Sequence, residues 1–233
     1  MTKLRKTTWR RIAACAAVGC QMLAGVTLAH AATVFDGDGN TNWWFDPVNW
    51  SRQDGPFLPP AKDDGSGNAI RDDTQINNGT GAWDVTGEGV VYDPDNDPFY
   101  ADAFNLQYPT GSANASAPYN AEYGPESIYR LYISRNSANQ NLLTIKSGNL
   151  YIDSTTIVGR SGSTTEQQNE GRINQLGGAL RVPYTSIDIG LIEDSGWGNG
   201  VYDYRGGILE VSMENGGGIR LAHGSTTLGP SGV

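Results

Sequence analysis

Hydrophobic and polar residues alternate in short stretches that recur at a nearly constant spacing in the second half of the chain. The clearest copies are GRINQLGGALRV, at Gly171–Val182, and GVYDYRGGILEV, at Gly200–Val211. A weaker copy, NLLTIKSGNLYI, covers Asn141–Ile152. Because self-similarity at about thirty residues is typical of stacked repeat folds, the pattern predicts that each copy is one layer of a repeating structure.

Aligning the copies by their glycines divides each repeat into three short strands. One shared position gives repeats of 30, 29 and 32 residues, and it is occupied by Asn141, Gly171, Gly200 and Gly232. A second position is a glycine that precedes an apolar, polar, apolar triplet, as at Gly148, Gly178 and Gly207. A third triplet recurs at 156–158, 187–189 and 219–221. Alternation with a period of two indicates strands with one buried face.

Parallel stacking of these repeats would bring like positions to about 4.8 Å from one another. Leu150, Leu180 and Leu209 would then form one inner column. On the outside, opposite charges would be neighbours, in the pairs Arg181 with Glu210 and Asp188 with Arg220. The expected fold is all-β: a right-handed parallel β-solenoid (β-helix) of about three rungs, with about 30 residues per rung, in residues 127–233.

The preceding section, residues 32–126, is rich in Asn, Asp, Gly and Pro, and no segment after residue 31 has a helical period. We expect it to be an irregular, β-rich cap, because the end of a solenoid would otherwise leave strand edges and core exposed. At the other end, Gly232-Val233 matches the start of a further repeat at Gly200-Val201. Two interpretations stay open: the loop from His223 to Pro230 closes the last rung, or the sequence is a fragment of a longer protein. The fragment is favoured, because solenoids need terminal caps.

The first 31 residues have the pattern of a bacterial secretory signal peptide. A basic start is followed by an apolar run at 12–28 and by the small-residue cleavage site Ala29-His30-Ala31. Three alternatives stay open: an uncleaved membrane anchor, a twin-arginine signal at Arg10-Arg11, and a lipoprotein signal ending at Cys20. We therefore predict a secreted or cell-surface protein whose mature chain has no membrane span.

Cleavage after Ala31 would change the composition of the chain. It removes both cysteines and five of the 16 basic residues but none of the 25 acidic ones, which leaves a net charge of −14. The mature chain has no disulfide, so its stability must come from stacking and burial. A strongly acidic surface argues against nucleic acid and anionic lipid as partners. Extracellular polysaccharide and components of the cell envelope remain candidate partners.

Several motifs resemble a known group of exported proteins. They are Trp43-Trp44, Asn49-Trp50-Ser51, Pro59-Pro60, Asp63-Asp64 and the repeated Gly-Gly-x-Leu-x-Val strands. Together they are similar to exported repeat proteins of planctomycetes and related bacteria, many of which carry a PEP-CTERM sorting signal or autotransporter-type strand repeats. The resemblance implies an adhesin-like or structural β-solenoid of the cell envelope, usually without known catalysis. This chain shows no sorting signal, so surface anchoring is implied by kinship alone.

One acidic turn is a weak candidate for binding calcium, and no other cofactor is expected. Asp36, Asp38 and Asn40 alternate oxygen ligands as a calcium loop does. The loop lacks the glycine expected where Thr41 lies and the acid expected where Pro47 lies. An acidic turn without a metal is the simpler interpretation, and it also applies to Asp93, Asp95 and Asp97.

Aromatic residues are the candidates for contact with a glycan. Trp43 and Trp44 lie in the densest aromatic patch and could stack on sugars, although the same patch could instead seal the first rung. Trp197 lies in a glycine-rich loop between strands and is the better candidate for an exposed contact.

The chain offers few groups for catalysis. The mature sequence has one histidine, His223, and no cysteine, so a thiol nucleophile is excluded and a serine triad would depend on that histidine. A β-helix lyase would have to use acids on the outward face of the rungs, with Arg181 or Arg220 nearby. Those acids are Asp188, Glu193, Asp194, Asp203 and Glu210. We expect a structural or adhesion-type protein that is not an enzyme; the alternative is a carbohydrate-active protein, either a glycan-binding module or a lyase.

Overall fold

The strands of this protein pair in parallel and form three sheets. The computed structural model describes residues 32–37, 41–52, 73–77, 87–107, 126–135, 141–160, 170–191, 198–212 and 217–221. Sheet I consists, in spatial order, of β15 (Gly218–Leu221), β12 (Ser186–Ile189), β9 (Thr156–Arg160), β6 (Arg130–Arg135), β3 (Asp73–Ile76), β1 (Ala32–Phe35) and β2 (Trp50–Arg52). Sheet II consists of β13 (Asn199–Tyr204), β10 (Glu170–Gln175), β7 (Asn141–Ile145) and β4 (Val90–Tyr92). Sheet III consists of β14 (Ile208–Val211), β11 (Ala179–Val182), β8 (Asn149–Ile152) and β5 (Ser127–Ile128).

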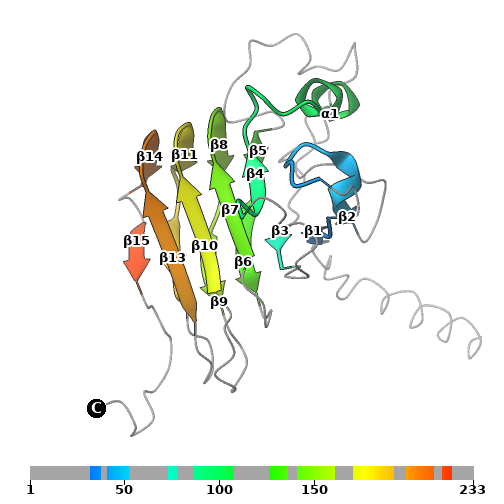
Figure 1. Cartoon of the computed structure of the whole chain (residues 1–233). Coiled ribbons are helices and arrows are strands. Elements are labelled where there is room, and N and C mark those ends of the chain that lie inside the picture. Colours follow the sequence, from blue (N-terminus) through cyan, green and yellow to red (C-terminus); the bar gives the residue numbers. More distant parts are fainter. Residues whose placement is uncertain are drawn as a thin grey trace, which may run out of the picture.

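The chain visits the three sheets in a fixed order, first II, then III, then I. We call one such passage a circuit. The described strands make the circuits β4–β5–β6, β7–β8–β9, β10–β11–β12 and β13–β14–β15, which lie side by side (Figure 1). Every described strand pairing is parallel except that of β1 with β2. The sequence predicted about three rungs, whereas the described strands form four circuits. The numbers differ because β4, which lies before residue 127, belongs to an earlier circuit.

The predicted register between repeats is confirmed. Gly171 pairs with both Asn141 and Gly200, and Leu180 pairs with both Leu150 and Leu209. Arg181 pairs with Glu210 and Asp188 with Arg220, so the two expected charge pairs are neighbours. Leu150 and Leu180 are fully buried in the main hydrophobic cluster. The period-two pattern therefore identified the inner columns correctly.

The corner between sheets II and III requires glycine. Gly148, Gly178 and Gly207 all have positive φ, at 69°, 63° and 90°. A Cβ at Gly207 would lie 2.2 Å from the carbonyl oxygen of Gly178 in the circuit below. Residues with a side chain neither adopt a positive φ readily nor fit this space. The spacing of these glycines therefore determines the length of the repeat.

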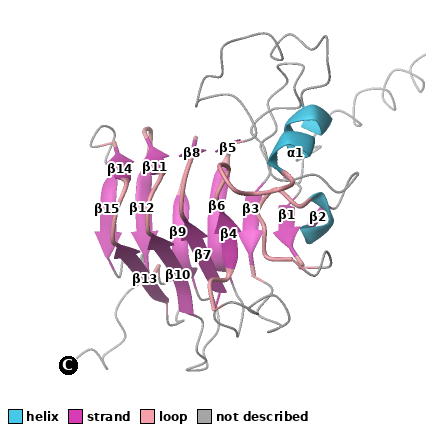
Figure 2. Ribbon diagram, turned by 45° about the horizontal axis from the view of Figure 1, so that its top comes forward, coloured by secondary structure: helices cyan, strands magenta, loops and turns pink. Residues whose placement is uncertain are grey.

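The section before residue 127 contains elements that the sequence did not predict. Strands β1 and β3 extend sheet I, and β4 extends sheet II. The expectation that no helix follows residue 31 is wrong, because α1 (Tyr100–Gln107) is helical; the short 3-10 helix η1 (Pro47–Asn49) adds a turn. Figure 2 shows both helices at the β1 end of the sheets. Within the part of the chain that the structure describes, no helix has the length and hydrophobicity to cross a membrane.

Aromatic side chains close the β1 end of the hydrophobic core. Phe35, Trp44, Phe45, Trp50 and Tyr92, which we name the aromatic end, are all fully buried. Trp50 contacts both Phe35 and Trp44 edge-on, with ring centroids 5.1 and 5.0 Å apart. Its indole N–H donates a hydrogen bond to the carbonyl oxygen of Trp44 at 2.6 Å. The sealing role considered for this patch is therefore what the structure shows.

Candidate functional site

Carboxylates gather where the segment 41–50, the turn after β4 and the corner between β7 and β8 meet. Asp46 and Asp93 contribute unfavourable charge interactions at Asp97, so these three residues form one electrostatic group, which we name the acidic corner. All three are at most 6% exposed. The sequence-based interpretation of Asp93 and Asp97 as a solvated acidic turn is therefore wrong, because neighbouring elements cover them. Asp95, between them, is exposed as expected.

Asp97 holds two backbone segments together. Its carboxylate accepts hydrogen bonds from the backbone amides of Phe45, at 3.1 Å, and Phe99, at 2.8 Å. The pKa of Asp97 is raised to about 6: burial is the largest cause, the two amide hydrogen bonds oppose the shift, and the charges of Asp46 and Asp93 add to it. A carboxylate that already accepts from two amides is engaged in fixing the loop at the aromatic end.

The other two carboxylates of the acidic corner have similar roles. Asp46 caps η1 by accepting from the backbone amide of Val48 at 3.1 Å, and it accepts from the Thr41 hydroxyl at 2.7 Å. Asp93 accepts from the side-chain amide of Asn96 at 3.1 Å and from the Ser147 hydroxyl. The contact with Ser147 joins the turn after β4 to the next circuit.

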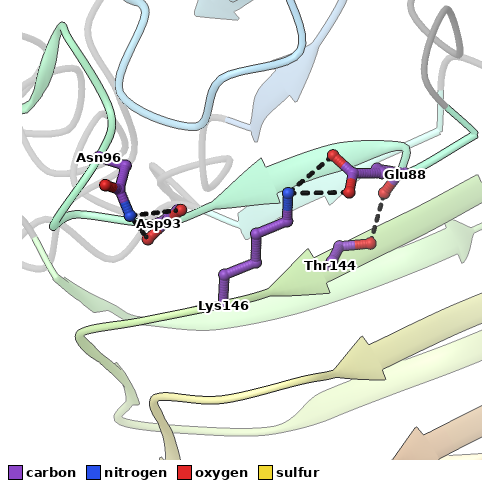
Figure 3. A network of polar contacts seen from close by, with 5 residues as sticks. All are labelled: Glu88, Asp93, Asn96, Thr144 and Lys146. Atoms are coloured by element: carbon purple, nitrogen blue, oxygen red, sulfur yellow. Dashed lines mark hydrogen bonds and ion pairs between the residues drawn. The ribbon is translucent and has the colours of Figure 1, made fainter.

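A second polar contact joins the same two circuits (Figure 3). The Lys146 ammonium lies 2.8 Å from both carboxylate oxygens of Glu88, and the Thr144 hydroxyl donates to the Glu88 carbonyl oxygen. Figure 3 shows Glu88 and Lys146 bridging the strands β4 and β7, with Asp93 and Asn96 at the other end of β4. These contacts align the first circuit on the second.

Helix α1 is also held by a carboxylate. The Tyr100 hydroxyl donates to Glu126 at 2.9 Å, and the same carboxylate accepts from the backbone amide of Asn149 at 2.7 Å. Burial, followed by the Glu126 charge, raises the pKa of Tyr100 well above its usual value. Tyr100 therefore keeps its proton and acts as a donor, as the hydrogen bond requires. No feature of the sequence had identified Glu126.

The predicted calcium ligands are only partly within the described residues. Asp36 is half-buried, and its backbone amide donates to the Asn49 carbonyl oxygen at 2.9 Å. Asp38 and Asn40 lie outside the described residues, so calcium binding there stays a prediction. Across the described ranges, the structure contains no group of three or more His, Cys, Asp or Glu residues arranged to hold a metal ion.

The three candidate glycan-contacting tryptophans differ in their positions. Trp44 is fully buried in the aromatic end, so its ring has no face for a sugar and the proposed glycan contact there is corrected. Trp43 is half-buried and pairs with Val91 through a parallel β-bridge. Trp197 lies outside the described residues and stays a prediction.

The outward acids considered for a lyase are matched with arginines. The Asp188 carboxylate contacts Arg220 at 2.6 Å and is buried, so it is less exposed than a residue of the outer face was expected to be. Glu210 contacts Arg181. Arg205 donates to Asp203 at 2.6 Å, and this hydrogen bond lowers the pKa of Asp203. The remaining candidates, Glu193, Asp194 and His223, lie outside the described residues.

Comparison with known proteins adds no relative to this picture. No family model, no curated protein and no solved structure matches the chain. Kinship with exported repeat proteins therefore stays a prediction.

Proposed function

We propose that this chain is an exported right-handed parallel β-solenoid, with rungs of about 30 residues, that serves as a structural or adhesion-type module without catalysis. The observation that carries the proposal is the continuous parallel register from β4 to β15 through all three sheets. Such stacking gives a rigid body whose outer faces are free to display contacts.

The use of the charged residues supports the structural role. The carboxylates of the acidic corner accept hydrogen bonds from their own chain, and described outward acids such as Asp188, Asp203 and Glu210 each contact an arginine. A general acid or base needs a carboxyl group free to reach a substrate. Carboxylates already engaged in contacts within their own chain favour a scaffold.

Export and surface location follow, in this proposal, from the signal peptide at residues 1–31. The candidate partners are extracellular polysaccharides or components of the cell envelope. Nucleic acid is disfavoured as a partner, because the chain is strongly acidic. Intact cells of the native producer, treated with trypsin and then analysed by mass spectrometry, test this location. We expect peptides cleaved at Arg172 and Arg205, in a sample free of abundant cytoplasmic proteins, and a mature chain that begins at Ala32.

The absence of catalysis is tested with acidic and neutral polysaccharides. We expect no unsaturated uronate and no new reducing ends after incubation with the purified chain. A sustained turnover that disappears in Glu210→Gln would replace the structural proposal with the lyase. Quenching of tryptophan fluorescence by a glycan, lost in Trp43→Ala but not in Tyr184→Ala, would instead assign a binding module.

A further inference from the structure

The surface formed by the fourth circuit has unpaired strand edges. β13, β14 and β15 each stand last in the order of their sheets, so each has a single neighbour among the described strands. An edge strand presents backbone N–H and C=O groups that another strand can pair with. We name the outer edges of these three strands the open face; they lie together at one end of the sheets in Figure 1.

The open face also exposes apolar side chains. Ile219 and Leu221 are 50% and 72% exposed, whereas Ile187 and Ile189, which occupy the same columns one circuit earlier, are at most 8% exposed. Tyr204 and Ile208 are also about half exposed, at 50% and 53%. A gathering of apolar side chains beside unpaired strands is typical of an interaction surface.

The charge of the open face differs from that of the chain. The whole sequence has a net charge of −9, which opposes the association of copies. The described residues of the fourth circuit, 199–212 and 217–221, carry two acids and two bases. They are Asp203, Glu210, Arg205 and Arg220. Two such faces can approach without net repulsion.

We propose that the open face docks the open face of a second copy of this chain, about a two-fold axis. All three edge strands run in one direction around the circuit, so a two-fold rotation makes them antiparallel to those of the other copy. With the axis through the middle of sheet II, β13 pairs with its own counterpart. β14 of each copy then lies along β15 of the other. The strand that carries Glu210 thereby faces the strand that carries Arg220, and opposite charges meet.

The other end of the sheets does not suit the same role. At that end β2 pairs antiparallel with β1 along the edge of sheet I, and the aromatic end fills the core. A contact between two open faces uses the same surface in both copies and closes after two. The proposal therefore predicts dimers and excludes open-ended filaments.

Sedimentation of the purified full-length chain over a wide concentration range tests the proposal. We expect a monomer–dimer equilibrium, and in Leu221→Lys a dissociation constant raised about tenfold or more, because each added charge enters the apolar contact between β15 of one copy and β14 of the other. Leu176→Lys is the matched control: Leu176 is 43% exposed at a corner of the third circuit, and its substitution should leave the equilibrium unchanged.

Three outcomes would overturn the proposal. They are a monomer at every concentration, oligomers that grow beyond two, and equal effects of the two lysine variants. Hydrogen exchange at low and high protein concentration gives an independent check that needs no variant. We expect the amides of β13, β14 and β15 to gain protection as the dimer forms, while those of β1 and β2 stay unchanged.

Discussion

The two ends of the stack treat their apolar residues in opposite ways. At the aromatic end, rings from three separate segments are fully buried, and the acidic corner fixes the loops that carry them. At the open face, Ile219 and Leu221 continue the inner columns but are at least half exposed. Each layer of a repeat protein is stabilised by its neighbours. The difference shows that the described residues cover the hydrophobic core at the aromatic end but not at the open face.

Removing a large ring from the aromatic end should have the largest effect on stability. Trp50→Ala is expected to lower the free energy of unfolding by about 3–5 kcal/mol, because a buried ring leaves a cavity. Tyr204→Ala at the open face, where the side chain is half exposed, should cost less than about 1 kcal/mol. Urea unfolding followed by circular dichroism measures both, and equal losses would show that the aromatic end is not a structural cap.

A pair of isoleucines in one column isolates the effect of a missing neighbour layer. Ile187 is fully buried and pairs with Ile219, which is half exposed. Ile187→Ala should cost about 2–5 kcal/mol and Ile219→Ala less than about 1 kcal/mol in the same unfolding experiment, performed where the chain is monomeric. Similar costs would mean that Ile219 is covered in solution.

The acidic corner should make the stability depend on pH. Burial raises the pKa of Asp97 from 3.8 to about 6, so the folded chain holds this proton more tightly than the unfolded chain. The stabilisation that protonated Asp97 gives to the folded chain is therefore fully present below about pH 3.8, and it is lost as the pH rises through about 6. Asp97→Asn, which cannot titrate, should be more destabilising relative to the native chain at about pH 5 than at about pH 7.5.

An exposed residue provides the control for this pH dependence. Asp102, on α1, is exposed, and Asp102→Asn should show no comparable difference between the two pH values. The thermal midpoints of both variants and the native chain give the comparison. If Asp97→Asn and Asp102→Asn changed in parallel with pH, Asp97 would not be the group responsible.

The outer ion pairs should contribute least. Arg181 contacts Glu210, but the two side chains are 29% and 52% exposed. A double-mutant cycle with Arg181→Ala and Glu210→Ala should give a coupling of about 0–1 kcal/mol, and added salt should reduce it. A larger coupling that salt does not alter would indicate that this pair, rather than the apolar columns, sets the register.

The sequence predicted the circuits from Asn141 onward because repeats of nearly equal length keep their glycines aligned. Gly148, Gly178 and Gly207 mark one corner, and the alternation after each identifies the inner side chains. The circuit of β4, β5 and β6 was missed as a repeat. Val90 pairs with Leu143, a separation much longer than the spacing between later circuits, so the period is lost before that point.

The candidate site was less predictable, because its contacts join distant segments. Asp97 accepts from Phe45 across 52 positions, and Lys146 meets Glu88 across 58. Local pattern cannot show whether an acidic turn is covered by another segment. Helix α1 was missed because its eight residues have no apolar stripe strong enough to indicate a helical period. The predicted glycan contact at Trp44 was wrong for the same reason: the residue is covered by other parts of the chain, which a local pattern does not reveal. Its ring packs against those of Trp50 and Tyr92.

Amide hydrogen exchange at a concentration where the chain is monomeric tests the asymmetry of the two ends most directly. The amides of β7 and β10 lie between two strands of sheet II. β4 is the other edge strand of that sheet, but the bridge from Trp43 to Val91 covers its outer side, whereas β13 has a described neighbour on one side only. We predict that protection is highest in β7 and β10, remains high in β4, and falls by an order of magnitude or more in β13 and β15. Uniform protection from β4 to β15 would contradict the account, because it would mean that both ends are equally closed.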